Sequence, residues 1–217
     1  MTPPGAITSL SWLSPVDLVA TGFFARGRVA VLDSTGKPRR FLGELPPGDL
    51  AVPIRVRQHA FQSALALNRT VQRVALATRH ADRLDIYSMD GRSHWENKRL
   101  FMFDPIYEVG QGADGPIMAS GENLRFGYIA IAAASDRIYA LYSGRTRGGF
   151  PGRATFGQYV HVYDWNAKLV GVLKLNDDVI DVAVDVSGKV LYGLRHDPDP
   201  AVVRYSVDRA AINKKPE

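Results

Sequence analysis

The sequence predicts an all-β protein built from repeated units of four short antiparallel strands. Three observations lead to this prediction: a short alternating strand ending in Asp or Ser recurs along the chain, turn residues separate the strands, and helical periodicity is nearly absent. The recurring strand occupies residues 28–33, 83–88, 159–164 and 201–206. Because an internal repeat of short strands is typical of radially stacked sheets, we expect a β-propeller with about four blades.

The first unit, residues 7–46, illustrates the pattern. Its expected strands lie at residues 7–14, 17–24, 28–33 and 39–45. The turn before the last strand reads Ser34-Thr35-Gly36-Lys37, which is a hairpin signal because glycine accepts the positive φ that tight turns need.

The second unit, residues 57–103, repeats this order. Its expected strands lie at residues 61–67, 73–78, 83–88 and 95–101. The turn before the last strand contains Asp90-Gly91, a strong turn pair. Residues 58–70 partly fit a helical repeat, but we interpret them as linker plus strand because the other units place a strand there.

The third and fourth units span residues 125–175 and 179–207. Their expected strands lie at 126–134, 137–142, 159–164 and 169–175, and at 179–185, 190–194 and 201–207. Small residues within 128–134 suit an innermost strand, where the sheets converge near an axis. The tail after residue 207 is polar and ends near a proline, so the fourth unit lacks an outer strand.

In these strand and turn patterns the chain resembles the TolB-like and NHL-like group of six-bladed propellers. Residues 31–37 and 86–92 and the turn 185–189 carry the resemblance, which spans nearly the whole chain. WD repeats match less well, and a β-sandwich is the alternative all-β architecture. The resemblance implies a fold. It does not indicate one function, because members of this propeller group include binding proteins, interaction scaffolds and some hydrolases or lyases.

Length sets a further expectation. At roughly 40 to 50 residues per blade, 217 residues supply about three and three-quarters blades rather than six. We therefore expect part of a six-bladed ring, which self-associates through its open blade ends or meets a missing segment. A closed four-bladed ring is the alternative.

Composition excludes several classes of protein. The chain is 46% hydrophobic and 23% charged, as in ordinary soluble proteins, and it has no apolar run long enough for a transmembrane segment. Its net charge of +5 comes from scattered residues, so we expect no nucleic-acid partner. Without cysteine there is no disulfide or thiolate site. No secretory signal is visible, and the sequence leaves the compartment open: periplasmic or secreted if the resemblance holds and an upstream signal has been lost, otherwise cytoplasmic.

The candidate ligand-binding residues lie in loops that the resemblance places on one face of the propeller. These loops are the connections between second and third strands, at residues 79–82, 143–158 and 195–200, and the links between units, at 46–58 and 104–125. We predict a ligand-binding site made by Arg79, His80, Arg145, Arg147 and Arg153. Guanidinium groups bind carboxylates or phosphates through paired hydrogen bonds, and Phe150 and Phe156 could stack on a sugar or base. The alternative is an exposed, flexible loop that arginine keeps soluble.

Signals for catalysis or metal binding are weak. The five histidines show no metal-binding spacing, so we expect no metal and no cofactor. We therefore predict a non-catalytic binding or interaction scaffold for an anionic or carbohydrate-like ligand or a protein partner. The alternative is a hydrolase or lyase on the same face, which would pair His80 or His196 with Asp197, Asp114 or Glu108.

Overall fold

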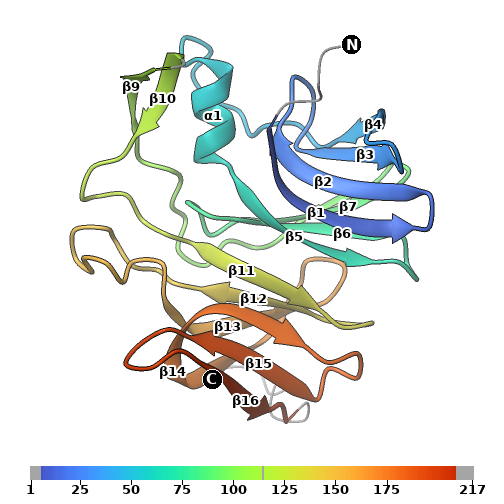
Figure 1. The fold of residues 1–217 in the computed structure, drawn as a ribbon, viewed down its shortest axis with the longest axis vertical. Coiled ribbons are helices and arrows are strands. Elements are labelled where there is room, and N and C mark those ends of the chain that lie inside the picture. Colours follow the sequence, from blue (N-terminus) through green and yellow to red (C-terminus); the bar gives the residue numbers. More distant parts are fainter. Residues whose placement is uncertain (1–5, 114, 209–217) are drawn as a thin grey trace.

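The computed structural model describes residues 6–113 and 115–208, which form an arc of antiparallel sheets (Figure 1). Two sheets have four strands each, one has six, and a two-stranded hairpin stands apart. In Figure 1 the first four-stranded sheet lies at the upper right and the six-stranded sheet at the bottom, with the second four-stranded sheet between them. The predicted all-β, propeller-like fold is confirmed.

The first sheet contains β1 (Ala6–Ser14), β2 (Asp17–Phe23), β3 (Val29–Asp33) and β4 (Pro38–Leu42) in that order. The turn after β3 explains why Asp recurs at strand ends. The Asp33 carboxylate accepts backbone N–H bonds from Thr35 and Lys37, at 2.9 and 3.0 Å, which holds the turn closed. Asp164 does the same for Asn166 and Lys168.

The second sheet contains β5 (Ser63–Asn68), β6 (Arg73–Thr78), β7 (Leu84–Ser88) and β8 (His94–Glu96). The last strand is much shorter than the predicted strand at residues 95–101. Asp82 is buried and accepts backbone N–H bonds from Phe101, Met102 and Phe103, so these residues wrap around its carboxylate and leave the sheet.

The third sheet unites the predicted third and fourth units. It contains β11 (Tyr128–Ala133), β12 (Ile138–Tyr142), β13 (Gly157–Tyr163), β14 (Leu169–Val184), β15 (Val190–Arg195) and β16 (Ala201–Ser206). The two strands predicted at 169–175 and 179–185 are one continuous strand of 16 residues. Its first half pairs with β13 and its second half mainly with β15, and no glycine or proline at 172–178 breaks it. The expectation that no outer strand follows residue 207 concerns residues 209–217, which lie outside the described residues.

The two long links between units carry structure that the sequence analysis missed. Helix α1 (Ile54–Ala60) occupies the last part of the loop predicted at 46–58 and the first residues of the segment 58–70, which we expected to be linker plus strand. The hairpin of β9 (Glu108–Gly112) and β10 (Gly115–Ala119) lies within the loop predicted at 104–125. Both pack together beside the arc, because Val56 and Ala60 of α1 share a buried cluster with Met118 of β10 (Figure 1).

Apolar side chains join each sheet to the next. Val31 and Leu76 belong to the cluster between the first two sheets, and Ile86 and Tyr163 to the cluster between the second and third. Leu141 and Leu191 belong to the cluster that joins the two halves of the six-stranded sheet. Within the part of the chain that the structure describes, no helix has the length and apolar character to cross a membrane.

Candidate functional site

Loops from three units converge on one cavity of about 510 Å³, which we call the loop-face cavity. Two of its lining residues, Ile129 of β11 and Ile180 of β14, come from the inner strands of the third and fourth units. The others lie in the links after β6, β12 and β15: Arg79, Gly152, Arg153, Thr155, Phe156, His196 and Asp197. The cavity therefore lies on the face that the resemblance predicted for ligand binding.

Arg79 lines this cavity without a charged partner. Its guanidinium lies 5.5 Å from the ring centroid of Phe126, and no described residue accepts a hydrogen bond from it or forms an ion pair with it. Burial lowers the pKa of Arg79, because removal from water disfavours the charged form. A half-buried cation of this kind is an electrostatic cost that an anion would relieve.

His80 is not among the residues that line the cavity. The residue is 5% exposed, its ring lies 5.1 Å from the ring of Phe126, and its Nδ1 has no hydrogen-bond partner among the described residues. Burial, and then the positive charges of Arg79 and His59, lower the pKa of His80 to about 4. The imidazole is therefore neutral near pH 7.

Two of the predicted arginines are neutralised by aspartates. Arg153 donates to Asp178 and Asp197, at 3.1 and 2.5 Å, and Arg145 donates to Asp178 at 2.6 Å. The two guanidinium charges are thus matched by two carboxylates. Arg147 contacts Ser120 and does not line the cavity.

The sequence analysis gave an exposed, flexible loop as the alternative for residues 143–158, but parts of this loop are buried. Ala154 and Phe156 are buried, and the Ser143 hydroxyl donates to the Ala154 carbonyl across the loop. Each of the two rings already contacts an arginine, since Arg145 lies over Phe150 at 4.9 Å and Arg153 over Phe156 at 5.1 Å.

The sequence analysis missed Asp178 and the two cavity isoleucines. Asp178 lies 25 and 33 residues from the arginines that it pairs with, so no local motif indicated the contact. Ile129 and Ile180 stand in ordinary apolar strand patterns, and only the meeting of β11 with β14 brings them into the cavity.

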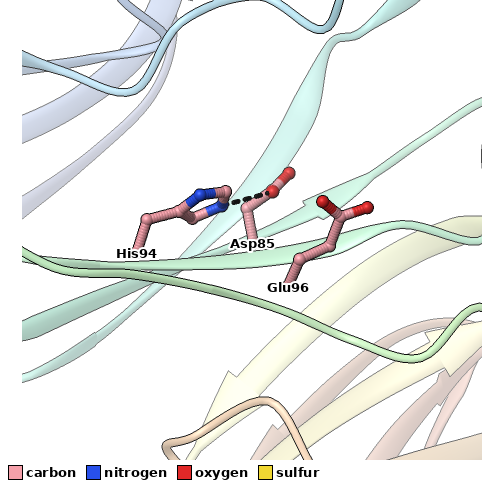
Figure 2. A group of neighbouring side chains, drawn as sticks. All are labelled: Asp85, His94 and Glu96. Atoms are coloured by element: carbon pink, nitrogen blue, oxygen red, sulfur yellow. Dashed lines mark hydrogen bonds and ion pairs between the residues drawn. The ribbon is translucent and has the colours of Figure 1, made fainter.

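A second cluster, at the edge of the second sheet, contains residue types that bind metals, but its side chains are joined by ion pairs and hydrogen bonds to arginines. Ligand atoms of Asp85, His94 and Glu96 lie within 4.8 Å of one another (Figure 2). Both oxygens of the buried Asp85 are occupied, because Arg28 donates at 2.5 Å, Arg83 at 2.8 and 3.0 Å, and His94 lies at 2.8 Å.

The electrostatics of this cluster disfavour a divalent cation. Burial alone would raise the pKa of Asp85, but the His94 hydrogen bond and the charges of Arg28 and Arg83 hold it well below its usual range. A metal ion would have to displace both guanidinium groups. Arg28 directly precedes β3 of the first sheet and also donates to Ser63 and Thr78, so the cluster connects the first two sheets.

The histidine–carboxylate pairs of the enzyme alternative are not assembled in the described residues. His196 meets Phe156 edge to face at 6.3 Å, and its neighbour Asp197 pairs with Arg153. Neither His80 nor His196 has a hydrogen bond to a carboxylate within residues 6–113 and 115–208. Asp114 lies outside the described residues, and Glu108 is exposed on β9.

Comparisons with known proteins agree on the fold. A family model described as TolB-like 6-blade propeller-like matches residues 10–187. The chain is similar to hydrazine synthase from Kuenenia stuttgartiensis, with 14% identity and a TM-score of 0.56 over 98% of this chain and 48% of that one. It is also similar to Raptor from Chaetomium thermophilum, with 15% identity and a TM-score of 0.50 over 94% of this chain and 15% of that one.

The comparison with curated proteins gave no match. The chain spans about half the length of the hydrazine synthase chain and a smaller part of Raptor. At these identities the likeness concerns the fold alone.

Proposed function

Because the chain belongs to the TolB-like six-blade propeller-like family, we propose that it is a non-catalytic binding module that holds an anionic ligand on its loop face. The single observation that carries the proposal is Arg79, a half-buried guanidinium that lines the cavity and lacks a described partner. An arginine in this position binds carboxylates or phosphates through two parallel hydrogen bonds.

The surroundings of Arg79 support an anion. The pKa of His59 is lowered by burial and then by the positive charges of Arg79 and Arg55, so positive charge prevails around the Arg79 side chain. A carbohydrate has less support, because Arg153 already covers the Phe156 ring on which a sugar would stack.

Thermal unfolding in different anions tests this proposal. Acetate and inorganic phosphate, each compared with chloride at the same ionic strength, should raise the midpoint of unfolding, because a ligand that binds only the folded state stabilises it. The rise should vanish in Arg79→Gln and persist in Arg92→Gln, a control whose side chain is 87% exposed on the turn between β7 and β8.

An equal rise in the Arg79→Gln variant would contradict the proposal. Hydrolysis of a simple ester such as 4-nitrophenyl acetate, abolished by His196→Ala, would instead favour the hydrolase alternative.

A further inference from the structure

The walls of the loop-face cavity restrict what accompanies the anionic group. Ile129 and Ile180 face the same space as Phe156, so a large part of the wall is apolar. Its volume of about 510 Å³ suits a small molecule rather than a folded partner, since pockets for such ligands measure roughly 300 to 1,000 Å³. Burying an apolar group against these side chains stabilises a complex in proportion to the area removed from water.

The charge of the cavity restricts the anion itself. The guanidinium of Arg153 is shared between Asp178 and Asp197, so Arg79 is the cation of the wall that has no described partner. Asp197 lies in the same wall, and its carboxylate would repel a second negative charge. One unit of negative charge on the ligand therefore fits better than two.

The polar groups of the wall argue against a ligand rich in hydroxyl groups. Thr155 and His196 line the cavity, but the guanidinium of Arg153 and the carboxylate of Asp197 already bond to each other. A sugar would bury hydroxyls with few partners, which costs free energy. An apolar body needs no such partners.

We propose that the ligand is a small monocarboxylate with an apolar body. Its carboxylate accepts two hydrogen bonds from Arg79, and its apolar body lies against Ile129 and Ile180. This inference rests on the proposed function, because it takes the anion site at Arg79 as given and adds the class of molecule that the site accepts.

Four probes of related shape separate the parts of this proposal by isothermal titration calorimetry. They are 3-phenylpropanoate, its neutral amide 3-phenylpropanamide, acetate, and 2-phenylethyl phosphate. We expect 3-phenylpropanoate to bind at least about tenfold more tightly than each of the others, since it alone combines one negative charge with an apolar body. Each titration is done at the same ionic strength.

Three variants locate the interaction. Arg79→Gln should weaken 3-phenylpropanoate at least about tenfold, and Arg79→Lys should recover only part of the loss because lysine lacks the planar fork. Ile180→Trp should weaken 3-phenylpropanoate by filling the cavity while leaving acetate unchanged. Arg92→Gln is the control, and thermal unfolding of each variant in buffer verifies that it folds.

The outcomes distinguish this inference from the proposed function. If acetate binds through Arg79 as tightly as 3-phenylpropanoate, the anion site stands and the apolar-bodied class is wrong. Tighter binding of 2-phenylethyl phosphate would overturn the monocarboxylate. Equal binding of the amide would overturn the role of charge, and the absence of any Arg79-dependent binding would overturn both proposals.

Discussion

At the scale of single residues, Asp82 decides where the second sheet ends. Its side chain is almost completely buried, and it accepts a hydrogen bond from Arg99 as well as three from the backbone of Phe101, Met102 and Phe103. Burial would raise the pKa of Asp82, but the N–H of Phe101 and the guanidinium of Arg99 lower it overall. A single carboxylate therefore organises a whole loop.

We expect Asp82→Ala to lower the free energy of unfolding by about 2 to 4 kcal/mol, because it leaves buried hydrogen-bond donors without an acceptor. Asp104→Ala is the matched control, since Asp104 also pairs with Arg99 but is 66% exposed, and it should change the free energy by less than about 1 kcal/mol. Denaturation by urea measures both. A similar small change for the two variants would contradict the role assigned to Asp82.

The buried imidazole of His161 makes stability depend on pH. Burial lowers the pKa of His161 to about 4 from an ordinary 6.5, and its Nδ1 lies 3.1 Å from the Tyr128 hydroxyl. Above pH 6.5 both the folded and unfolded states are neutral at this residue. Between pH 6.5 and about 4 the unfolded chain binds a proton at this residue that the folded chain does not. The free energy of unfolding therefore falls as the pH is lowered through this range.

Replacing His161 by Phe should therefore flatten part of the fall in unfolding free energy between pH 7 and pH 5. His80, whose pKa is also about 4, supplies a second contribution that remains in this variant. Urea denaturation gives the free energy of unfolding at pH 7 and at pH 5. The difference between these two values is compared between the variant and the unmodified chain. An unchanged difference in His161→Phe would show that this imidazole does not cause the effect.

At the scale of elements, ion pairs from β14 hold the loop at 143–158. Asp178 lies at the centre of β14 and binds both Arg145 and Arg153, while Arg145 also donates to the Arg153 carbonyl. The side chain of Arg145 is 16% exposed, whereas Arg147 is exposed. The long glycine-rich loop is thus tied down at its two ends.

We expect limited trypsin digestion to cut this loop first after Arg147 and to spare Arg145, because cleavage requires the chain to leave its bonded conformation. Asp178→Asn should increase cutting after Arg145 and Arg153. Asp181→Asn, an exposed position on the same strand, should leave the pattern unchanged. Mass spectrometry of the fragments identifies the cuts, and early cleavage after Arg145 in the unmodified chain would refute the expectation.

At the scale of the whole molecule, both ends of the arc expose apolar side chains. Leu10 and Trp12 on β1 are each 52% exposed, and they are strand partners of the buried Ala20 and Leu18. At the other end, Leu194 is 41% exposed and its partner Val202 is 71% exposed. In a propeller these faces are the ones that meet neighbouring blades.

We therefore expect a polypeptide of this sequence to self-associate as its concentration rises. At about 25 cal/mol per Å², covering a few hundred Å² of apolar surface stabilises an assembly by several kcal/mol. Trp12→Glu should shift sedimentation toward the monomer, and Val186→Glu should not, because Val186 is 91% exposed at a turn. Sedimentation of the unmodified chain as a monomer at every concentration would speak against open blade ends.

The sequence by itself determined what depends on neighbouring residues. Alternating strands and their turns are set by residues two to four positions apart, so the recurring third strand and the turn aspartates such as Asp33 were predictable. The same local patterns carried the resemblance to the family that the comparison then showed. Residue type and loop position led to the prediction that Arg79 and Arg153 bind a ligand, which stays a prediction, although both line the loop-face cavity.

The tertiary structure decided what depends on residues far apart in the chain. The early end of β8 follows from Asp82, about 20 residues before the backbone that it binds, and α1 forms where Val56 and Ala60 can pack on Met118 of β10. Contacts between distant segments also pair Arg153 with Asp178 and Asp197. They bring Arg79, which has no described partner, into the same cavity. Charge pairing and burial act through space, so residue order along the chain does not specify them.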